Sequence, residues 1–111
     1  MANLSGERRK ERRYIVAGVS ARVNGEECPI ADMSATAVRL LRPYDLAITR
    51  RAYTLAFTFD AAQKTFTVSG TLVRCTASCF VLRYDPPSPT WEALIRSADT
   101  FEQTRLSEIF G

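Results

Sequence analysis

The sequence predicts a mainly β fold, a small six-stranded antiparallel barrel with a C-terminal helix, on three observations. Short segments of alternating apolar and polar residues recur along the chain, and brief turns connect them. Three prolines within residues 86–89 end this pattern, and apolar residues then recur at helical spacing. The chain has 111 residues, of which 46% are hydrophobic and 24% charged. This composition suits one folded domain rather than a disordered or fibrous chain.

The first two predicted strands form a hairpin. Alternation begins at Tyr14 and places one set of side chains on a single face: Ile15, Ala17, Val19, Ala21 and Val23. Asn24 and Gly25 follow, and this pair is a strong hairpin signal because both residues tolerate a positive φ. The second strand is predicted over residues 26–33, and Pro29 within it indicates an edge position or a bulge.

Four more strands are expected over residues 37–41, 53–59, 65–74 and 80–84. Gly70 indicates a bulge or bend in the longest of them. The helix is predicted over about residues 90–110, with Ser88 or Thr90 capping its start. Trp91 lies on the apolar face of this helix, so we expect it to pack in the core rather than stack on a ligand.

The residue counts exclude most ordinary enzyme chemistry. The chain has no histidine, which removes the commonest general base and most mixed zinc sites. Cys28, Cys75 and Cys79 form no CxxC pair, so we expect reduced, buried thiols rather than a disulfide or zinc framework. We therefore expect no catalytic residues, no metal and no cofactor. The apolar runs are too short to cross a bilayer and no secretory signal is recognisable, which predicts a cytoplasmic protein without membrane insertion.

Basic residues are concentrated near the N-terminus. Residues 7–13 hold five cations in seven positions, whereas the net charge of the whole chain is only +3. Because clustered cations repel one another, residues 1–13 are predicted to form a flexible arm, and residues 14–111 the barrel and helix. Guanidinium groups match phosphate oxygens with paired hydrogen bonds and stack on bases, so this arm suits a phosphorylated nucleotide.

A second polar group lies at the predicted turn between the second and third strands. Asp32 supplies an acceptor carboxylate there, and Ser34 supplies a hydroxyl. A carboxylate accepts hydrogen bonds from the N1–H and exocyclic amine of guanine, whereas arginine pairs well with guanine O6 and N7. An arginine arm that faces an Asp-x-Ser turn therefore suits a guanine nucleotide with phosphates.

In their order and spacing these two motifs resemble the signature of the PilZ domain family, bacterial receptor modules for cyclic di-GMP. That signature is an RxxxR arm followed about twenty residues later by (D/N)xSxxG. Here the arm offers RxxxR in two registers, from Arg8 or from Arg9, and Asp32 begins the sequence DMSATA. The β-rich middle and the closing helix extend the resemblance over nearly the whole chain, and imply the family's six-stranded split barrel.

The resemblance implies a role for each matched residue. Four arginines would bind the phosphates and a guanine of cyclic di-GMP, with either register leading: Arg8, Arg9, Arg12 and Arg13. Asp32 and Ser34 would hydrogen-bond a guanine from the barrel surface. Ala37 stands where the family has glycine, and its methyl costs about 1 kcal/mol or more if the position needs a positive φ. The resemblance further implies a noncatalytic receptor that signals in trans to an effector protein and controls motility or biofilm formation.

Two other functions are compatible with the same residues. A PilZ-like adaptor would bind only protein partners, and the departure at Ala37 favours this alternative. A small nucleic-acid-binding barrel would use the arm electrostatically, with steeply salt-dependent binding, although nucleic acid is the less favoured partner. Asp32 and Ser34 can also cap a turn through bonds to the backbone. Arg74 and Arg83 are expected on a solvated outer strand face rather than in a ligand site.

Overall fold

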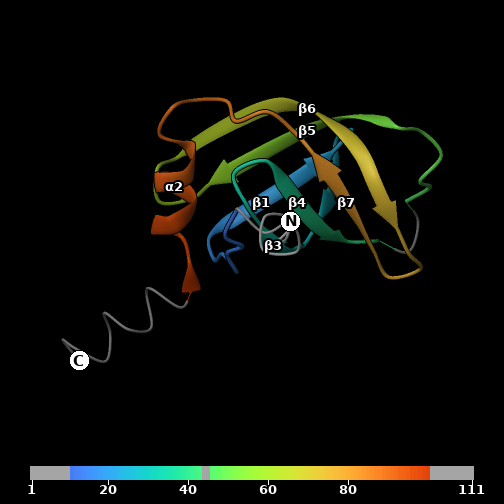
Figure 1. The fold of residues 1–111 in the computed structure, drawn as a ribbon, viewed down its shortest axis with the longest axis horizontal. Helices are drawn as coiled ribbons and strands as arrows, with labels where there is room; N and C mark the ends of the chain where they lie inside the picture. The colour runs from blue at the N-terminus through green and yellow to red at the C-terminus, as the bar shows by residue number, and fades with distance from the viewer. Residues whose placement is uncertain (1–10, 44–45, 101–111) are drawn as a thin grey trace, which may run out of the picture.

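The computed structural model describes residues 11–43 and 46–100. In them seven antiparallel strands form one sheet of order β2-β1-β5-β6-β7-β4-β3, which curls into a nearly closed barrel (Figure 1). The elements are β1 (Val19–Val23), β2 (Glu26–Cys28), β3 (Ile30–Met33), β4 (Ala37–Leu41), β5 (Ala52–Phe59), β6 (Lys64–Cys75), β7 (Cys79–Arg83) and α2 (Trp91–Ser97). The predicted barrel with a helix after its last strand is confirmed. No helix in these described ranges is long and apolar enough to cross a membrane.

Pro29 separates the two edge strands of the sheet. β2 pairs with β1, whereas β3, which follows directly after the proline, pairs with β4. Proline has no amide hydrogen, so the ladder is interrupted there and the chain passes from one edge of the sheet to the other. The described part of the chain therefore has seven strands where the sequence predicts six. β3 also contacts β1 near the other edge, so the curled sheet forms a nearly closed barrel.

The alternation that begins at Tyr14 changes phase before β1. Tyr14 is buried and Ile15 is 62% exposed, whereas Ala21 and Val23 are fully buried. Gly18 lies between these segments with a φ of +75°, a conformation that favours glycine and interrupts the strand. The prediction that Ile15 and Ala17 share the buried face is therefore wrong, since both are exposed. Tyr14 points inward instead, and its backbone forms an isolated antiparallel bridge with Met33 of β3.

Glycine is favoured at Gly25 and at Gly70 for different structural reasons. The β1–β2 hairpin turn is confirmed, because Asn24 has a φ of +51° and Gly25 a φ of +87°. Gly70, by contrast, lies in a regular part of β6, and the register shift against β7 falls further along the strand. A Cβ at Gly70 would lie 3.3 Å from the Leu82 Cδ1 atom, so close packing rather than a bulge favours glycine there.

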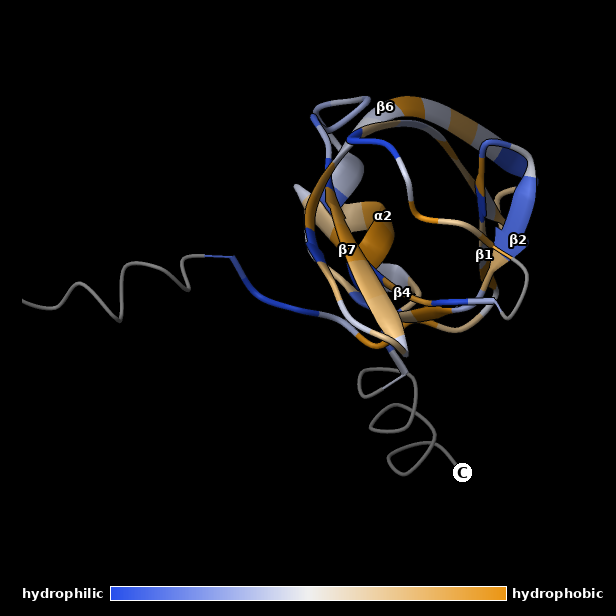
Figure 2. Cartoon of the chain, turned by 90° about the vertical axis from the view of Figure 1, so that its right-hand side faces the viewer, coloured by the Kyte–Doolittle hydropathy of each residue, from blue (hydrophilic) through white to orange (hydrophobic). Residues whose placement is uncertain are grey.

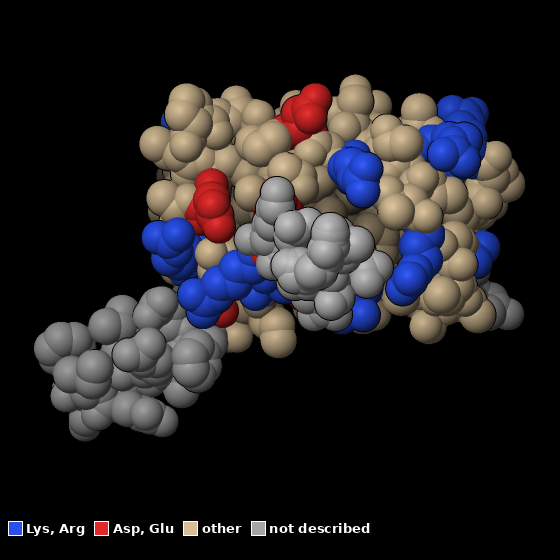
Figure 3. Space-filling view, in the orientation of Figure 1, with Lys and Arg blue, Asp and Glu red and all other residues tan. Residues whose placement is uncertain are grey.

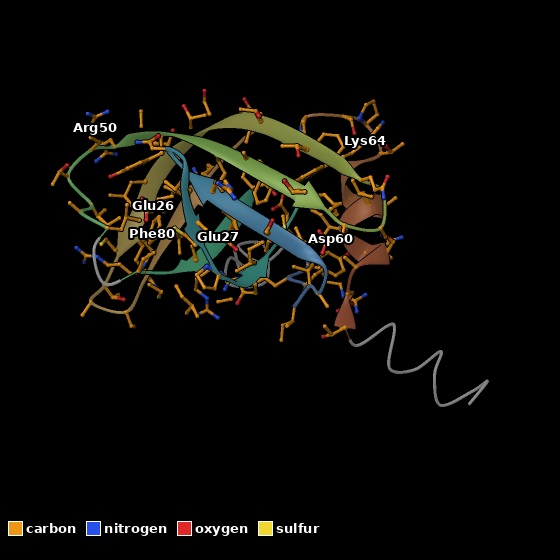
Figure 4. All side chains as sticks on the ribbon, turned by 180° about the vertical axis from the view of Figure 1, so that it is seen from behind. Glu26, Glu27, Arg50, Asp60, Lys64 and Phe80 are labelled. Carbon is orange, nitrogen blue, oxygen red and sulfur yellow. The ribbon has the colours of Figure 1, made fainter. Side chains whose placement is uncertain are left out.

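Helix α2 covers one end of the barrel. Figure 2 looks along the barrel from the opposite end and shows the helix behind the ring of strands. Trp91 is 1% exposed, and its ring lies 5.2–6.0 Å, centroid to centroid, from four aromatic rings: Phe57, Phe59, Phe66 and Tyr84. The prediction that Trp91 packs in the core is confirmed. In Figure 4, Phe80 lies within the barrel, Asp60 and Lys64 lie beside the helical end, and Arg50 lies at the far end.

The cysteines differ in burial. Cys28 is fully buried, Cys79 is half-buried and Cys75 is exposed, and all three are free thiols. The predicted burial is thus wrong for Cys75, because it ends β6 at the exposed hairpin turn before β7. Burial, with a smaller contribution from the nearby carboxylates of Glu26 and Glu27, raises the pKa of Cys28 from 9.0 to about 11.

Several predictions concern the ends of the chain. Helix α2 begins after Thr90 as expected, but the side chain of Thr90 forms no capping hydrogen bond. The last part of the predicted helix, residues 101–111, and the arm residues Arg8 and Arg9 lie outside the described residues.

Candidate functional site

Backbone hydrogen bonds bring the N-terminal segment to β3. The Tyr14 amide donates to the Met33 carbonyl at 2.7 Å, and the Met33 amide donates to the Tyr14 carbonyl at 2.9 Å. The Tyr14 side chain is buried, and its hydroxyl donates to Glu92 Oε2 at 3.2 Å. Residues 11–13 therefore lie alongside the turn that follows β3. The structure thus places the described part of the arm next to the Asp-x-Ser motif.

The β3–β4 turn, residues 34–37, is organised by Ser34. Its amide donates to the Ala37 carbonyl at 2.8 Å, and its Oγ accepts from the amides of Ala37 at 3.2 Å and Thr36 at 3.4 Å. The turn-capping role expected of Ser34 is therefore present. Because both backbone donors point at the oxygen, the hydroxyl proton of Ser34 is left to donate. Within the turn its acceptor is the Ala37 carbonyl, at a long 3.5 Å, and a closer acceptor lies outside the turn.

That hydroxyl proton is donated to Glu11. A single carboxylate oxygen of Glu11, Oε1, accepts from Ser34 Oγ at 2.9 Å and from Thr36 Oγ1 at 2.6 Å. Sequence reasoning assigned no role to Glu11 or Thr36. The sequence signal for Glu11 was an acidic residue within a run of cations. Its hydrogen-bond partners could not be predicted, because they depend on how the arm lies against the turn.

Asp32 lies between two arginines from different parts of the chain. Arg39, its partner in the β3–β4 ladder, contacts Oδ2 through Nη2, and Arg13 Nη1 lies 3.9 Å from Oδ1. Asp32 is 8% exposed, whereas the Arg13 side chain is 65% exposed. One carboxylate oxygen is thus held by the barrel while the other faces the arm. Arg39 Nε is buried without a hydrogen-bond partner among the described residues.

Sequence reasoning missed Arg39. Cross-strand charge pairs are a common feature of antiparallel sheets. The signal was therefore present in the spacing of Asp32 and Arg39 across a short turn. Its use requires the register of the β3–β4 pair, which shifts between Ile30 and Asp32.

The two described arginines of the arm face different groups. Arg12 Nη2 lies 3.9 Å from Asp99 Oδ2, and the Arg12 guanidinium lies 5.2 Å from the centre of the Tyr14 ring. Arg12 is therefore directed toward the segment after α2, and Arg13 toward Asp32. Both guanidinium groups are largely exposed, so these long ion pairs contribute little to stability. The structure brings Arg13, Asp32 and Ser34 together and leaves Arg12 beside them.

Ala37 occupies the position of the motif glycine without strain. Among the described residues the non-glycine residues with a positive φ are Asn24 and Gln63. Ala37 opens β4 and pairs with Arg83 in the β4–β7 ladder. The energetic cost that a positive φ would impose on alanine therefore does not arise at this position.

A buried tyrosine links the turn to the helix. The Tyr84 hydroxyl donates to the Ser34 carbonyl at 2.7 Å and accepts from Trp91 Nε1 at 3.0 Å. Burial raises the pKa of Tyr84 strongly, the hydrogen bond from Trp91 opposes this shift, and the charge of Glu11 adds to it. The hydroxyl therefore stays protonated and keeps its donor, so the turn and α2 are joined by one hydrogen-bonded chain.

Opposite charges lie close together in the described part of the site. Arg13 and Arg39 face Asp32 and Arg12 faces Asp99, whereas the Glu11 carboxylate contacts the hydroxyl groups of the turn. Figure 3 shows basic and acidic side chains close together at the helical end of this face and basic side chains on the other half. Within the described ranges no group of three or more cysteine, aspartate or glutamate side chains is placed to hold a metal ion.

Comparison with solved structures identifies the fold. The chain superposes on the Bacillus subtilis inhibitor of motility (MotI/DgrA) with a TM-score of 0.63 and 13% identity, over 88% of this chain and 52% of that one. The chain has a PilZ-like fold. An uncharacterised Legionella protein is also similar, with a TM-score of 0.56 and 11% identity, over 90% of this chain and 99% of that one.

At these identities the PilZ-like likeness concerns the fold alone. This chain spans about half the length of MotI/DgrA. No protein-family model matches the sequence, and no curated protein is similar to it.

Proposed function

We propose that this PilZ-like chain is a noncatalytic receptor for cyclic di-GMP that binds the nucleotide between its arm and the β3–β4 turn. The observation that carries the proposal is the juxtaposition of two motifs that are separate in the sequence. Arg13 lies 3.9 Å from the Asp32 carboxylate, and Ser34 lies at the same turn. These are residues that the PilZ signature assigns to the nucleotide.

The donors and acceptors of the site suit a guanine with phosphates. Asp32 Oδ1 faces the arm and accepts from the guanine N1–H and amine, while Arg39 holds the other oxygen and fixes the carboxylate plane. The Ser34 hydroxyl donates to a guanine or phosphate acceptor. The Arg13 guanidinium exchanges its contact with Asp32 for a phosphate of the nucleotide. Because Arg12 is directed toward Asp99, this arrangement favours the register that pairs Arg9 with Arg13, with Arg8 and Arg12 assisting.

The output is proposed to pass to an effector protein in trans. A dianionic nucleotide neutralises the arm and orders it against the barrel, which creates a surface made of both. The name of MotI/DgrA, an inhibitor of motility, favours control of bacterial motility or biofilm formation as the outcome. A receptor of this kind acts in the cytoplasm.

Isothermal titration calorimetry of the full chain with cyclic di-GMP tests the proposal, with GMP and cyclic di-AMP as specificity controls. Arg13→Ala and Asp32→Ala are expected to weaken binding by about tenfold or more, since each removes a charged partner. Arg50→Ala removes the same charge as Arg13→Ala at the far end of the barrel and is expected to leave the affinity unchanged.

Two results would contradict the proposed receptor function. One is the absence of binding heat in a protein that circular dichroism shows to be folded. The other is binding that Asp32→Ala does not weaken. Salt-dependent binding of RNA or DNA without cyclic di-GMP selectivity would favour the nucleic-acid alternative.

A further inference from the structure

The arm itself occupies the hydrogen-bonding groups of the proposed site. Glu11 Oε1 accepts both hydroxyl protons of the turn, from Ser34 at 2.9 Å and from Thr36 at 2.6 Å. Arg13 faces the carboxylate oxygen of Asp32 that would accept from guanine. The polar groups that the barrel offers to the nucleotide, on Asp32 and Ser34, therefore already have partners from the arm, which are Arg13 and Glu11.

We propose that Glu11 is a built-in competitor, an autoinhibitory carboxylate that the nucleotide must displace from the β3–β4 turn. This inference rests on the receptor function proposed above and adds the residue that sets its affinity. Glu11 lies between the arginines of the motif in sequence, two residues before Arg13, which faces Asp32.

The geometry at Ser34 favours direct competition. Ser34 is 6% exposed, and its oxygen accepts from the Ala37 and Thr36 amides, so the orientation of its O–H group is restricted. One outward proton can serve only one strong acceptor. A carboxylate oxygen and a phosphate oxygen are both anionic acceptors, so Glu11 Oε1 stands where an acceptor atom of the nucleotide would lie.

Charge adds to this competition. With Glu11 at the turn, its negative charge adds to those of Asp32 and Asp99 beside the guanidinium groups of the described site. Once Glu11 leaves, the site loses a negative charge, and a dianionic nucleotide is attracted to it more strongly. The contact of Glu11 therefore opposes nucleotide binding both by occupying donors and by lowering the local potential.

Titration of paired variants tests the competitor. The apparent dissociation constant is the intrinsic constant divided by the fraction of molecules with the contact open, so Glu11→Ala is expected to tighten cyclic di-GMP binding roughly three- to tenfold. Thr36→Val removes one donor to Glu11 without changing the charge, and we expect it to tighten binding less. In the double variant the two effects are expected to be non-additive, because both act on one contact. Glu26→Gln, on β2, provides a charge-matched control and is expected to change nothing.

A second readout needs no nucleotide. Trypsin cleavage after Arg12 and Arg13 in the native chain is expected to be faster in Glu11→Ala and in Thr36→Val than in the wild type and in Glu26→Gln. Equal cleavage rates in all four proteins would contradict the proposed role of Glu11. If the wild type binds cyclic di-GMP and Glu11→Ala binds it no more tightly, the proposed competition by Glu11 is refuted and the proposed receptor function is not. If neither the wild type nor any variant binds cyclic di-GMP, the proposed receptor function is refuted, and the proposed competition by Glu11 with it.

Discussion

Removal of the Tyr84 hydroxyl tests whether the turn and the helix are joined through the barrel. Tyr84→Phe deletes one oxygen atom that donates to the Ser34 carbonyl at 2.7 Å and accepts from Trp91 Nε1 at 3.0 Å. Tyr84 is 2% exposed and Trp91 1% exposed, so neither is readily rehydrated in the folded chain. The substitution therefore leaves one buried donor and one buried acceptor without a partner.

The structure allows the size of this effect to be worked out. A buried polar group left without its hydrogen bond costs about 1–3 kcal/mol, so two such groups give an expected loss of about 2–6 kcal/mol. For a domain of this size each 1 kcal/mol lowers Tm by about 4 °C, so a fall of roughly 8–24 °C is expected. The phenyl ring fills the same space, which excludes a cavity as the cause.

Urea unfolding followed by circular dichroism measures the loss, with Tyr14→Phe as the matched control. The Tyr14 hydroxyl donates to the exposed Glu92 at 3.2 Å, so its removal is expected to cost less than about 1 kcal/mol. If Tyr84→Phe is no more destabilising than Tyr14→Phe, the buried hydrogen bonds from turn to helix do not stabilise the fold.

Two further predictions concern stability. Because burial raises the pKa of Cys28 from 9.0 to about 11, the folded state holds the thiol proton more tightly than the unfolded state. This contribution to the free energy of unfolding, about 2–3 kcal/mol, is fully present below pH 9 and is lost as pH rises through 11. The dependence of Tm on pH checks this, since Cys28→Ala should flatten the alkaline fall, and an unchanged slope would contradict it. Ala37→Gly is expected to leave cyclic di-GMP affinity within about twofold and to lower stability by about 0.5–1 kcal/mol, because Ala37 has no positive φ to relieve. A large gain of affinity on calorimetry would show that the methyl group obstructs the nucleotide.

Much of the barrel could be predicted because its signals are local. The positive φ values of Asn24 and Gly25 follow from the residue types, and residues 37–41 form β4 as their alternation predicts. The helical spacing likewise placed Trp91 in the core. The orientation of Ile15 could not be predicted, because a single positive φ at Gly18 shifts the phase of the residues before it.

The candidate site was predictable only in part. Asp32 and Ser34 were found from their residue types and spacing, because a turn brings them together within a few residues. The roles of Glu11 and Arg39 depend on contacts between separate segments. These contacts are set by the backbone pairing of Tyr14 with β3 and by the register of β3 against β4. The same pairing decides that Arg13 faces Asp32, and residue spacing alone leaves both arginine registers open.

The most direct test of the central claim is a ¹H–¹⁵N NMR titration of the full chain with cyclic di-GMP. Binding at the proposed site is expected to concentrate the amide shifts at residues 11–14 and 32–37, which form its two sides. Amides of the β6–β7 hairpin turn, residues 76–79, should stay unchanged. Spectra that do not change at saturating nucleotide, or shifts confined to residues 76–79, would contradict the account.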